Sequence, residues 1–205
     1  MKTTGIIILA AGNSSRLGMP KQILLYQGRS LLACITDEAI KAKLHPIVVV
    51  TGANALNVSA SIKNKKVTTV HNKAWEDGVG SGISLGISKL LSIDSAVQEI
   101  IVSVCDQPFL SAALFHDLHA KKLESGKGIV ASHYNDGVGT PVLFSSDYFE
   151  TLMKLNGQDG AIDLLRMHES DLQSVPFPLG VIDIDTIDDY RSFLRISENL
   201  QGSMA

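Results

Sequence analysis

A short segment near the start of the chain carries residue types that bind phosphate. Residues 9–21 read Leu-Ala-Ala-Gly-Asn-Ser-Ser-Arg-Leu-Gly-Met-Pro-Lys and follow a continuous apolar run. Small residues at positions 10–12 let the backbone approach a ligand closely, and loop amides can point at anionic oxygens. Arg16 can grip a phosphate in a fork, and Lys21 adds a compact positive charge. This segment is therefore a candidate phosphate-binding loop.

The spacing in this loop differs from two familiar nucleotide-binding patterns. It lacks the Gly-Lys-Ser/Thr ending of the Walker loop, and it is not the Gly-x-Gly-x-x-Gly of dinucleotide-binding folds. An ordinary strand-to-helix turn with exposed cations would have the same composition. On the residues alone, both interpretations stay open.

A second candidate is the carboxylate of Asp106, which closely follows the apolar run Glu99–Val104. Ligands of α/β folds bind at the carboxyl ends of strands, which is where Asp106 would lie. Mg²⁺ binds through one or two carboxylates together with phosphates. Asp106 is therefore a candidate metal ligand, and an aspartate that caps the end of a strand is the alternative.

A third group of acidic residues lies near the C-terminus. Asp183 and Asp185 alternate about an isoleucine in the predicted strand Val181–Asp185, so they would share one face of it. Asp188 and Asp189 fit the N-terminus of the following helix, where the helix dipole stabilises negative charge. Either of the first two could complete a metal site, and a well-capped final helix explains all four.

Other residues give weaker signals. Trp75 could stack on a base, but a lone tryptophan is more often a packing residue. His116 and His119 lie three residues apart without an obvious third ligand, which favours packing over zinc binding. Cys34 and Cys105 lack metal-ligand spacing, which is typical of a reduced, cytoplasmic protein.

The elements that would position these residues alternate along the chain, as in βαβ units. Apolar runs predict strands at Ile6–Ala11, Ile47–Thr51, Val67–Val70, Glu99–Val104, Gly128–Ser132, Thr140–Phe144 and Val181–Asp185. Helical patterns are predicted over 30–44, 82–91, 111–122, 146–155, 160–167 and 186–196. The short connection before Thr140 favours an antiparallel strand there, because a parallel strand needs a longer crossover.

Length and composition limit the class of protein. The 205 residues carry a net charge of −3, and 45% of them are hydrophobic. Such a chain can bury a full core without disulfide or metal. The charge argues against nucleic-acid binding, and the first apolar run is too short to span a membrane. We therefore expect one domain over 1–198 and a frayed tail over 199–205.

Five segments in chain order resemble motifs of sugar-nucleotide-type nucleotidyltransferases, and most closely the branch of the molybdenum cofactor cytidylyltransferases. They are residues 9–21, Asn72–Ser81, Cys105–Pro108, Gly139–Pro141 and Asp183–Tyr190. The resemblance implies a three-layer α/β/α fold of the nucleotide-diphospho-sugar-transferase type (Rossmann-like), with a mixed, mostly parallel sheet. It also implies a nucleotide-binding half over 1–126 and an acceptor-side half over 127–198.

The same resemblance implies roles for particular residues. The nucleotide would contact Leu9, Ala10, Ala11, Gly12, Asn13, Ser14, Ser15, Arg16, Lys21, Gly78, Ser81 and Asp106. Arg16, Lys21 and Asp106 would be catalytic, and Asp106 with Asp185 would bind Mg²⁺, supported by Asp183. The acceptor would contact Gly139, Thr140, Pro141, Asp159 and Gly160.

Two departures from the family pattern lie in the second half. The usual Gly-Asp-x-Gly-Ala-Arg has Gln158 in place of its acidic residue and Ile162 in place of its arginine. Two charges are thereby lost from the expected acceptor side. Ile187 replaces a proline in the first turn of the last helix, a mild change because proline is favoured there but not required.

The function implied by the resemblance is Mg²⁺-dependent transfer of CMP from CTP to a molybdopterin-type molybdenum cofactor, with release of pyrophosphate. A molybdo-hydroxylase or its chaperone would be the protein partner, and neither nucleic acid nor a membrane is expected. Alternatives are guanylyl transfer to the same cofactor, nucleotidyl transfer to a sugar or alditol phosphate, and a non-catalytic nucleotide-binding accessory protein. Related guanylyltransferases have Leu-Ala-Gly-Gly in the loop, so the Ala11 methyl predicts a preference for CTP over GTP.

Overall fold

The computed structural model describes residues 3–135, 137–155 and 161–202. At its centre is a sheet with the strand order β5-β4-β1-β6-β8-β7-β9. The strands are β1 (Thr3–Ala10), β4 (Ile47–Thr51), β5 (Thr68–His71), β6 (Val97–Val104), β7 (Ile129–Tyr134), β8 (Gly137–Ser145) and β9 (Leu172–Pro176). The first four in the order are parallel, and β8 runs antiparallel to β6 and β7. The expected mixed, mostly parallel sheet and its antiparallel strand are confirmed.

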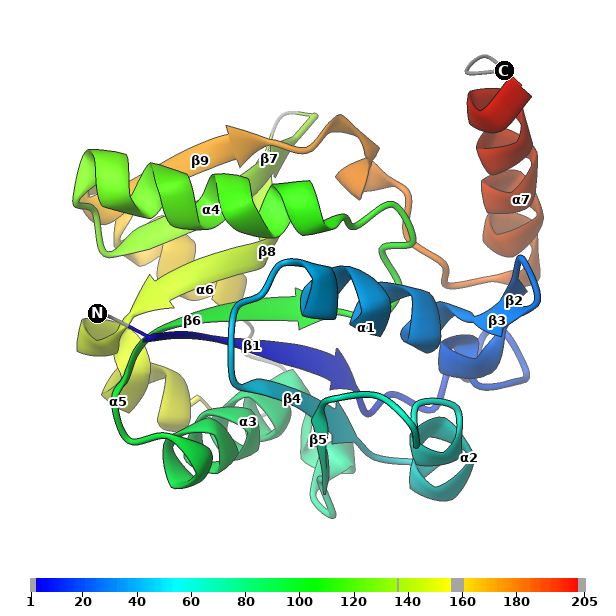
Figure 1. The fold of residues 1–205 in the computed structure, drawn as a ribbon, viewed down its shortest axis with the longest axis horizontal. Helices are drawn as coiled ribbons and strands as arrows, with labels where there is room; N and C mark the ends of the chain where they lie inside the picture. Colours follow the sequence, from blue (N-terminus) through cyan, green and yellow to red (C-terminus); the bar gives the residue numbers. More distant parts are fainter. Residues whose placement is uncertain (1–2, 136, 156–160, 203–205) are drawn as a thin grey trace.

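Helices cover both faces of the sheet, which gives three layers (Figure 1). One face is covered by α1 (Leu31–Lys41), α2 (Ala55–Ala60) and α4 (Ala112–Ser125), and the other by α3 (Val79–Ile93), α5 (Phe149–Met153) and α6 (Ala161–Met167). Side chains of β1 alternate between the two cores: Ile6 and Ile8 enter the first, and Ile7 enters the second. Burial on both faces explains why this strand is a continuous apolar run.

Serine caps set the start of two helices, as the sequence predicts. The Ser30 hydroxyl accepts a hydrogen bond from Ala33 N at 3.1 Å, and the Ser111 hydroxyl accepts one from Leu114 N at 3.3 Å. Each cap satisfies a backbone amide that has no partner within the helix. α1 and α4 therefore begin directly after their serines.

The C-terminal part corrects the sequence prediction. Val181–Asp185 is not a strand: the 3₁₀ helix η5 (Pro178–Val181) is followed by irregular chain up to α7 (Ile187–Gly202). The alternating pattern has another cause, because Ile184 is fully buried in a separate small core. The strand beside β7 is β9, which was not predicted, and α7 continues beyond the expected end near Ile196.

α7 packs against a short hairpin near the end of the sheet. The strands β2 (Leu25–Tyr26) and β3 (Arg29–Ser30) form the hairpin, and neither was predicted. The Phe193 ring of α7 contacts the rings of Tyr26 and Phe109, with centroids 4.8 Å and 5.4 Å away. α7 therefore stands beside the hairpin (Figure 1), and the segment before it reaches the carboxyl ends of the strands. Within the ranges the structure describes, no helix is both long and apolar enough to cross a membrane.

Candidate active site

The loop after β1 is held in shape by a buried glutamine. Gln22 is 1% exposed and lies in the short 3₁₀ helix η1 (Lys21–Ile23). Its side-chain amide donates to the carbonyl oxygens of Ala10, at 3.1 Å, and Gly12, at 2.9 Å. These two bonds fix the path of the backbone where the predicted phosphate-binding loop begins.

The same loop folds back on Lys21. Ser14 has a φ of 56°, and its carbonyl oxygen accepts a hydrogen bond from Leu17 N at 3.0 Å. The Ser14 hydroxyl accepts another from Lys21 N, also at 3.0 Å. The serine therefore shapes the turn and places the lysine. Neither Ser14 nor Ser15 lines the cavity of about 340 Å³ that begins beside this loop.

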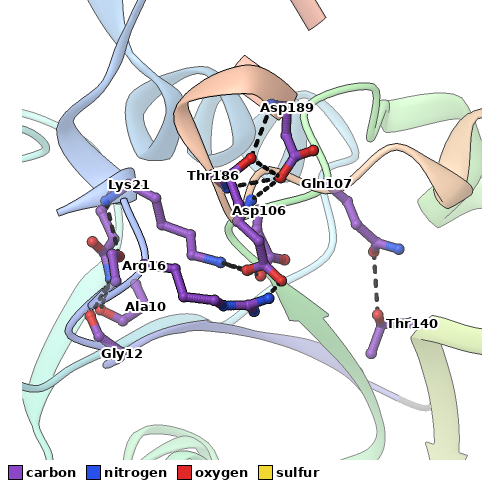
Figure 2. A network of polar contacts seen from close by, with 12 residues as sticks. Ala10, Gly12, Arg16, Lys21, Asp106, Gln107, Thr140, Thr186 and Asp189 are labelled. Carbon is purple, nitrogen blue, oxygen red and sulfur yellow. Dashed lines mark hydrogen bonds and ion pairs between the residues drawn. The ribbon is translucent and has the colours of Figure 1, made fainter. Parts of the chain in front are cut away.

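Lys21 is the centre of a cluster of charges where three segments meet (Figure 2). Its ammonium donates to Asp106 at 3.0 Å and to Asp185 at 2.6 Å. Arg16 pairs with the other carboxylate oxygen of Asp185. The lysine side chain is only 12% exposed, against 26% for Asp106 and 29% for Asp185. The structure therefore brings together the four side chains Arg16, Lys21, Asp106 and Asp185, and that they act together on a substrate stays a prediction.

These charges shift one another's pKa values. The hydrogen bond from Lys21 holds the pKa of Asp185 below its usual value, and Arg16 contributes in the same direction. Burial alone would lower the pKa of Lys21, but Asp106 and Asp185 outweigh it, so that pKa is raised. Partial burial raises the pKa of Asp183, and the charges of Asp185 and Asp106 raise it further. At neutral pH the cluster therefore holds a cationic lysine and an ionised Asp185.

The start of α7 fixes Asp185 in place. The Asp189 carboxylate accepts hydrogen bonds from Asp185 N at 3.2 Å and from Thr186 N at 2.7 Å. In return the Thr186 hydroxyl accepts one from Asp189 N at 3.2 Å, which completes a reciprocal capping box. Ile184 N also donates to the backbone oxygen of Asp106 at 3.0 Å, so the two segments that carry the carboxylates are joined directly.

Asp106 and Asp185 fit a magnesium ion that shares its coordination with phosphates. Both carboxylates contact one ammonium group, so a cation at that point would reach both. Across the part of the chain that the structure describes, no group of three or more His, Cys, Asp or Glu side chains could hold a metal. Mg²⁺ commonly binds through one or two carboxylates plus substrate phosphates. The pair therefore suits a metal that arrives with a nucleotide.

A cavity of about 340 Å³ lies beside the charge cluster. The predicted nucleotide-binding residues that line it are Leu9, Ala11, Gly12, Asn13, Lys21, Gly78 and Asp106. Trp75 also lines it, so this residue does more than pack in a core. A Cβ atom on Gly52 would lie 2.8 Å from the Cβ atoms of both Ala11 and Trp75. Only glycine at this position therefore lets these two cavity-lining residues pack so closely.

Ser81 contacts two residues that line this cavity, Asn72 and Gly78. Its hydroxyl accepts a hydrogen bond from the Asn72 amide at 2.8 Å and lies 2.7 Å from the carbonyl oxygen of Gly78. Ser81 lines an adjacent cavity, and Asn72, 4% exposed, lines both that cavity and the one beside the charge cluster. Ser81 therefore shapes the turn that carries Gly78, whose φ of 111° favours glycine.

A second cavity, of about 590 Å³, shares Val104 and Asp106 with the first. Its other lining residues are Gln107, Tyr134, Asn135, Gly137, Thr140, Gly180, Val181 and Asp183. None of the described lining residues is a lysine, arginine or histidine. The two cavities thus meet at the predicted metal ligand, which is what a reaction between two bound substrates requires.

Of the three predicted acceptor residues that the structure describes, only Thr140 lines this second cavity. Gly139 lies against the Tyr134 hydroxyl with no space for a side chain, and the Pro141 carbonyl accepts a hydrogen bond from Ser132 at 2.8 Å. Asp159 and Gly160 lie outside the described residues, as does Gln158. Ile162 is half-exposed on α6 and lines neither cavity.

Four polar residues of the site are missing from the predicted site residues: Gln22, Asn72, Gln107 and Tyr134. Of these, Asn72 and Gln107 do lie in motifs that carry the family resemblance. Two of the four had a usable signal, because Gln22 and Gln107 directly follow Lys21 and Asp106 in the sequence. An amide that lies beside a functional charge and near a buried strand must find hydrogen-bond partners there.

Comparison with known proteins agrees with this geometry. Residues 6–173 match the MobA-like NTP transferase domain. Nicotine blue oxidoreductase of Paenarthrobacter nicotinovorans is 36% identical over 109 residues, which cover 51% of this chain and only 50% of that protein. The molybdenum cofactor cytidylyltransferase of Escherichia coli (strain K12) is 25% identical over 199 residues, 93% of this chain and 95% of that protein.

A solved structure extends the likeness to the whole fold. The crystal structure of Rv0371c from Mycobacterium tuberculosis H37Rv has a TM-score of 0.80 at 26% identity, over 95% of this chain and 98% of that one. The same mycobacterial protein has also been solved as a complex with manganese. With the domain match extending over most of the sequence, this chain belongs to the MobA-like NTP transferase family.

Proposed function

We propose that this protein transfers CMP from CTP to a molybdopterin-type acceptor and releases pyrophosphate. The observation that carries the proposal is the meeting of two cavities at Asp106, whose carboxylate contacts the Lys21 ammonium, which also contacts Asp185. CTP would occupy the cavity beside the loop, and the acceptor would occupy the second. The Escherichia coli relative, which matches over nearly its whole length, is named for this cytidylyl transfer. We place the reaction in the cytoplasm, with a molybdo-hydroxylase or its chaperone as recipient of the product.

In the proposed reaction, an oxygen of the acceptor's phosphate attacks the α-phosphorus of CTP. A new P–O bond forms in line with the bond to the β-phosphate, which breaks as pyrophosphate leaves with the electron pair. Catalysis of this kind rests on positioning and charge stabilisation. Arg16 and Lys21 would contact the phosphate oxygens, and they would reduce repulsion between the two anionic substrates.

Asp106 and Asp185 would hold Mg²⁺, which would neutralise charge on the triphosphate and the leaving pyrophosphate. In the structure Lys21 already contacts both carboxylates. When the nucleotide binds, the Lys21 ammonium would therefore leave the two carboxylates and turn toward the phosphates. The carboxylates of Asp106 and Asp185 would then be free to bind the metal ion. The manganese complex of the mycobacterial protein supports divalent metal binding in proteins of this fold.

Pyrophosphate release tests the proposal. The protein is mixed with CTP, Mg²⁺ and molybdenum-loaded molybdopterin, and GTP, sugar phosphates and alditol phosphates replace each substrate in turn. We expect release with CTP and the cofactor, and release slowed by about a hundredfold or more in the Asp106→Asn variant. Release only with GTP or only with a sugar phosphate would replace the substrate assignment. Nucleotide binding without release from any pair would favour the accessory protein.

One relative is named an oxidoreductase, so the same panel includes a reduced nicotinamide dinucleotide. The sequence lacks the Gly-x-Gly-x-x-Gly of dinucleotide-binding folds after β1, and we expect no binding of this molecule. Tight binding of it, together with no pyrophosphate release, would contradict nucleotidyl transfer.

A further inference from the structure

Gln107 connects three walls of the second cavity. It directly follows Asp106 and is 4% exposed. Its side-chain nitrogen donates to the carbonyl oxygen of Gly180 at 3.0 Å, and its side-chain oxygen accepts a hydrogen bond from the Thr140 hydroxyl at 3.2 Å (Figure 2). One amide therefore joins the end of β6 to β8 and to η5. These contacts exist because β8 runs antiparallel and begins where β6 ends.

The segment between η5 and α7 depends on this connection. Residues 182–186 have no regular structure, yet they carry Asp183 and Asp185. Two hydrogen bonds tie the segment to the end of β6: Gln107 to Gly180, and Ile184 N to the oxygen of Asp106. They lie on either side of Asp183, so together they fix the distance between this wall and Asp106. Loss of the first would leave a buried carbonyl without its donor and release one end.

We propose that Gln107 is a positioning residue, which holds the acceptor side of the second cavity in register with Asp106. The inference rests on the proposed function, since it takes this cavity as the acceptor site. Small misplacements of reacting groups cost much of the rate even when both substrates still bind. Gln107 does not line the nucleotide-side cavity, so its loss should affect the acceptor and leave the nucleotide site intact.

The test compares Gln107→Met with a matched control, Gln173→Met. Methionine keeps the length of the side chain but removes both hydrogen bonds, and Gln173 is exposed on β9. CTP binding is followed through the fluorescence of Trp75, the only tryptophan of the chain, which lines the nucleotide-side cavity. Steady-state pyrophosphate release gives kcat/KM for the acceptor. Hydrogen exchange in the peptide over 178–186 reports on the segment directly.

We expect Gln107→Met to lower kcat/KM for the acceptor by about ten- to a hundredfold, as for a lost buried hydrogen bond that aligns substrates. The Kd for CTP should stay as in the control, and exchange over 178–186 should accelerate. Thr140→Val removes only one of the two bonds and should give a smaller fall of the same kind. Should Gln107→Met fail to fold, Thr140→Val decides through hydrogen exchange over 178–186, because loss of a direct contact between Thr140 and the acceptor would not accelerate that exchange.

Two results for Gln107→Met would overturn the proposal. The first is a loss of CTP affinity as large as the loss of kcat/KM for the acceptor, which would indicate general damage to the site. The second is a kcat/KM for the acceptor equal to that of Gln173→Met. Absence of transfer by the unmodified protein would instead contradict the proposed function. In that case hydrogen exchange alone tests the role of Gln107. Unchanged exchange over 178–186 in Gln107→Met would mean that the side-chain amide of Gln107 does not hold the segment.

Discussion

Replacing Lys21 with alanine gives the sharpest test of the charge cluster. The ammonium contacts both Asp106, at 3.0 Å, and Asp185, at 2.6 Å, from a side chain that is 12% exposed. It is thus a largely buried cation that lines the first cavity and contacts Asp106, which lines both. Removal of one preorganised contact to charge that develops in a transition state costs about 3–4 kcal/mol. We expect kcat of Lys21→Ala to fall by about 10²–10³-fold.

The same variant should bind a divalent metal more tightly in the absence of nucleotide. Without the lysine, two partly exposed carboxylates face each other with less neutralising charge, and a metal ion no longer competes with the ammonium. Binding of Mn²⁺ to the nucleotide-free protein, followed by calorimetry, measures this directly. Lys63→Ala is the control, because Lys63 is exposed and lies outside the charge cluster.

The two measurements can refute the reasoning separately. An unchanged kcat with a higher KM for CTP would mean that Lys21 binds ground state and transition state equally. Weaker Mn²⁺ binding in Lys21→Ala than in Lys63→Ala would mean that the lysine supports the carboxylates and does not compete with the metal.

Three further predictions concern other residues. Asp106→Asn should slow turnover by about a hundredfold or more at saturating Mg²⁺, because a neutral amide holds the metal poorly; turnover equal to wild type would make Asp106 a cap. Ala11→Gly should shrink a CTP preference that we expect at about 10–200-fold in kcat/KM, and a wild type that uses GTP better would contradict this. Asp171 accepts hydrogen bonds from Gly128 N at 2.9 Å and the Tyr148 hydroxyl at 2.7 Å, and the first of these is the main cause of its lowered pKa. Its lowered pKa stabilises the fold above the usual value of 3.8, and this stabilisation is lost as pH falls through the lower folded pKa. Asp171→Asn should therefore lower the free energy of unfolding by about 1 kcal/mol at pH 7, and by less below pH 3.8 in urea titrations; a difference independent of pH would contradict it.

The first half of the chain was predictable because local patterns and tertiary structure agree there. Parallel strands buried on both faces are continuous apolar runs, and serines cap two of the helices between strands. The carboxyl ends of such strands lie at one edge, so Lys21 and Asp106 had to come close. The resemblance to a known family then brought Asp185 to the same place, and the hydrogen bonds of Lys21 agree with it.

The second half of the chain was less predictable, because two different structures can produce the same alternating sequence pattern. An apolar residue between two aspartates fits a strand with one buried face. Ile184 shows the same alternation without pairing in the sheet, since its side chain fills a small core with Phe193 and its amide bonds to Asp106. β9 gave no such signal, because its central residues are partly polar and it is held by its pairing with β7.

The segment that misled the sequence prediction is also the one that completes the site. A regular strand over 181–185 would satisfy its backbone within the sheet and place alternate side chains on opposite faces. The irregular segment instead bonds to the residues at the end of β6, so Asp183 lines the second cavity while Asp185 reaches Lys21. Its geometry is thus set by a few specific hydrogen bonds. The one that Gln107 donates to Gly180 and the one that Asp189 accepts from Asp185 N each depend on a single side chain. Acceptor choice in this protein should therefore respond to substitutions at these supporting residues as strongly as to changes in the cavity wall.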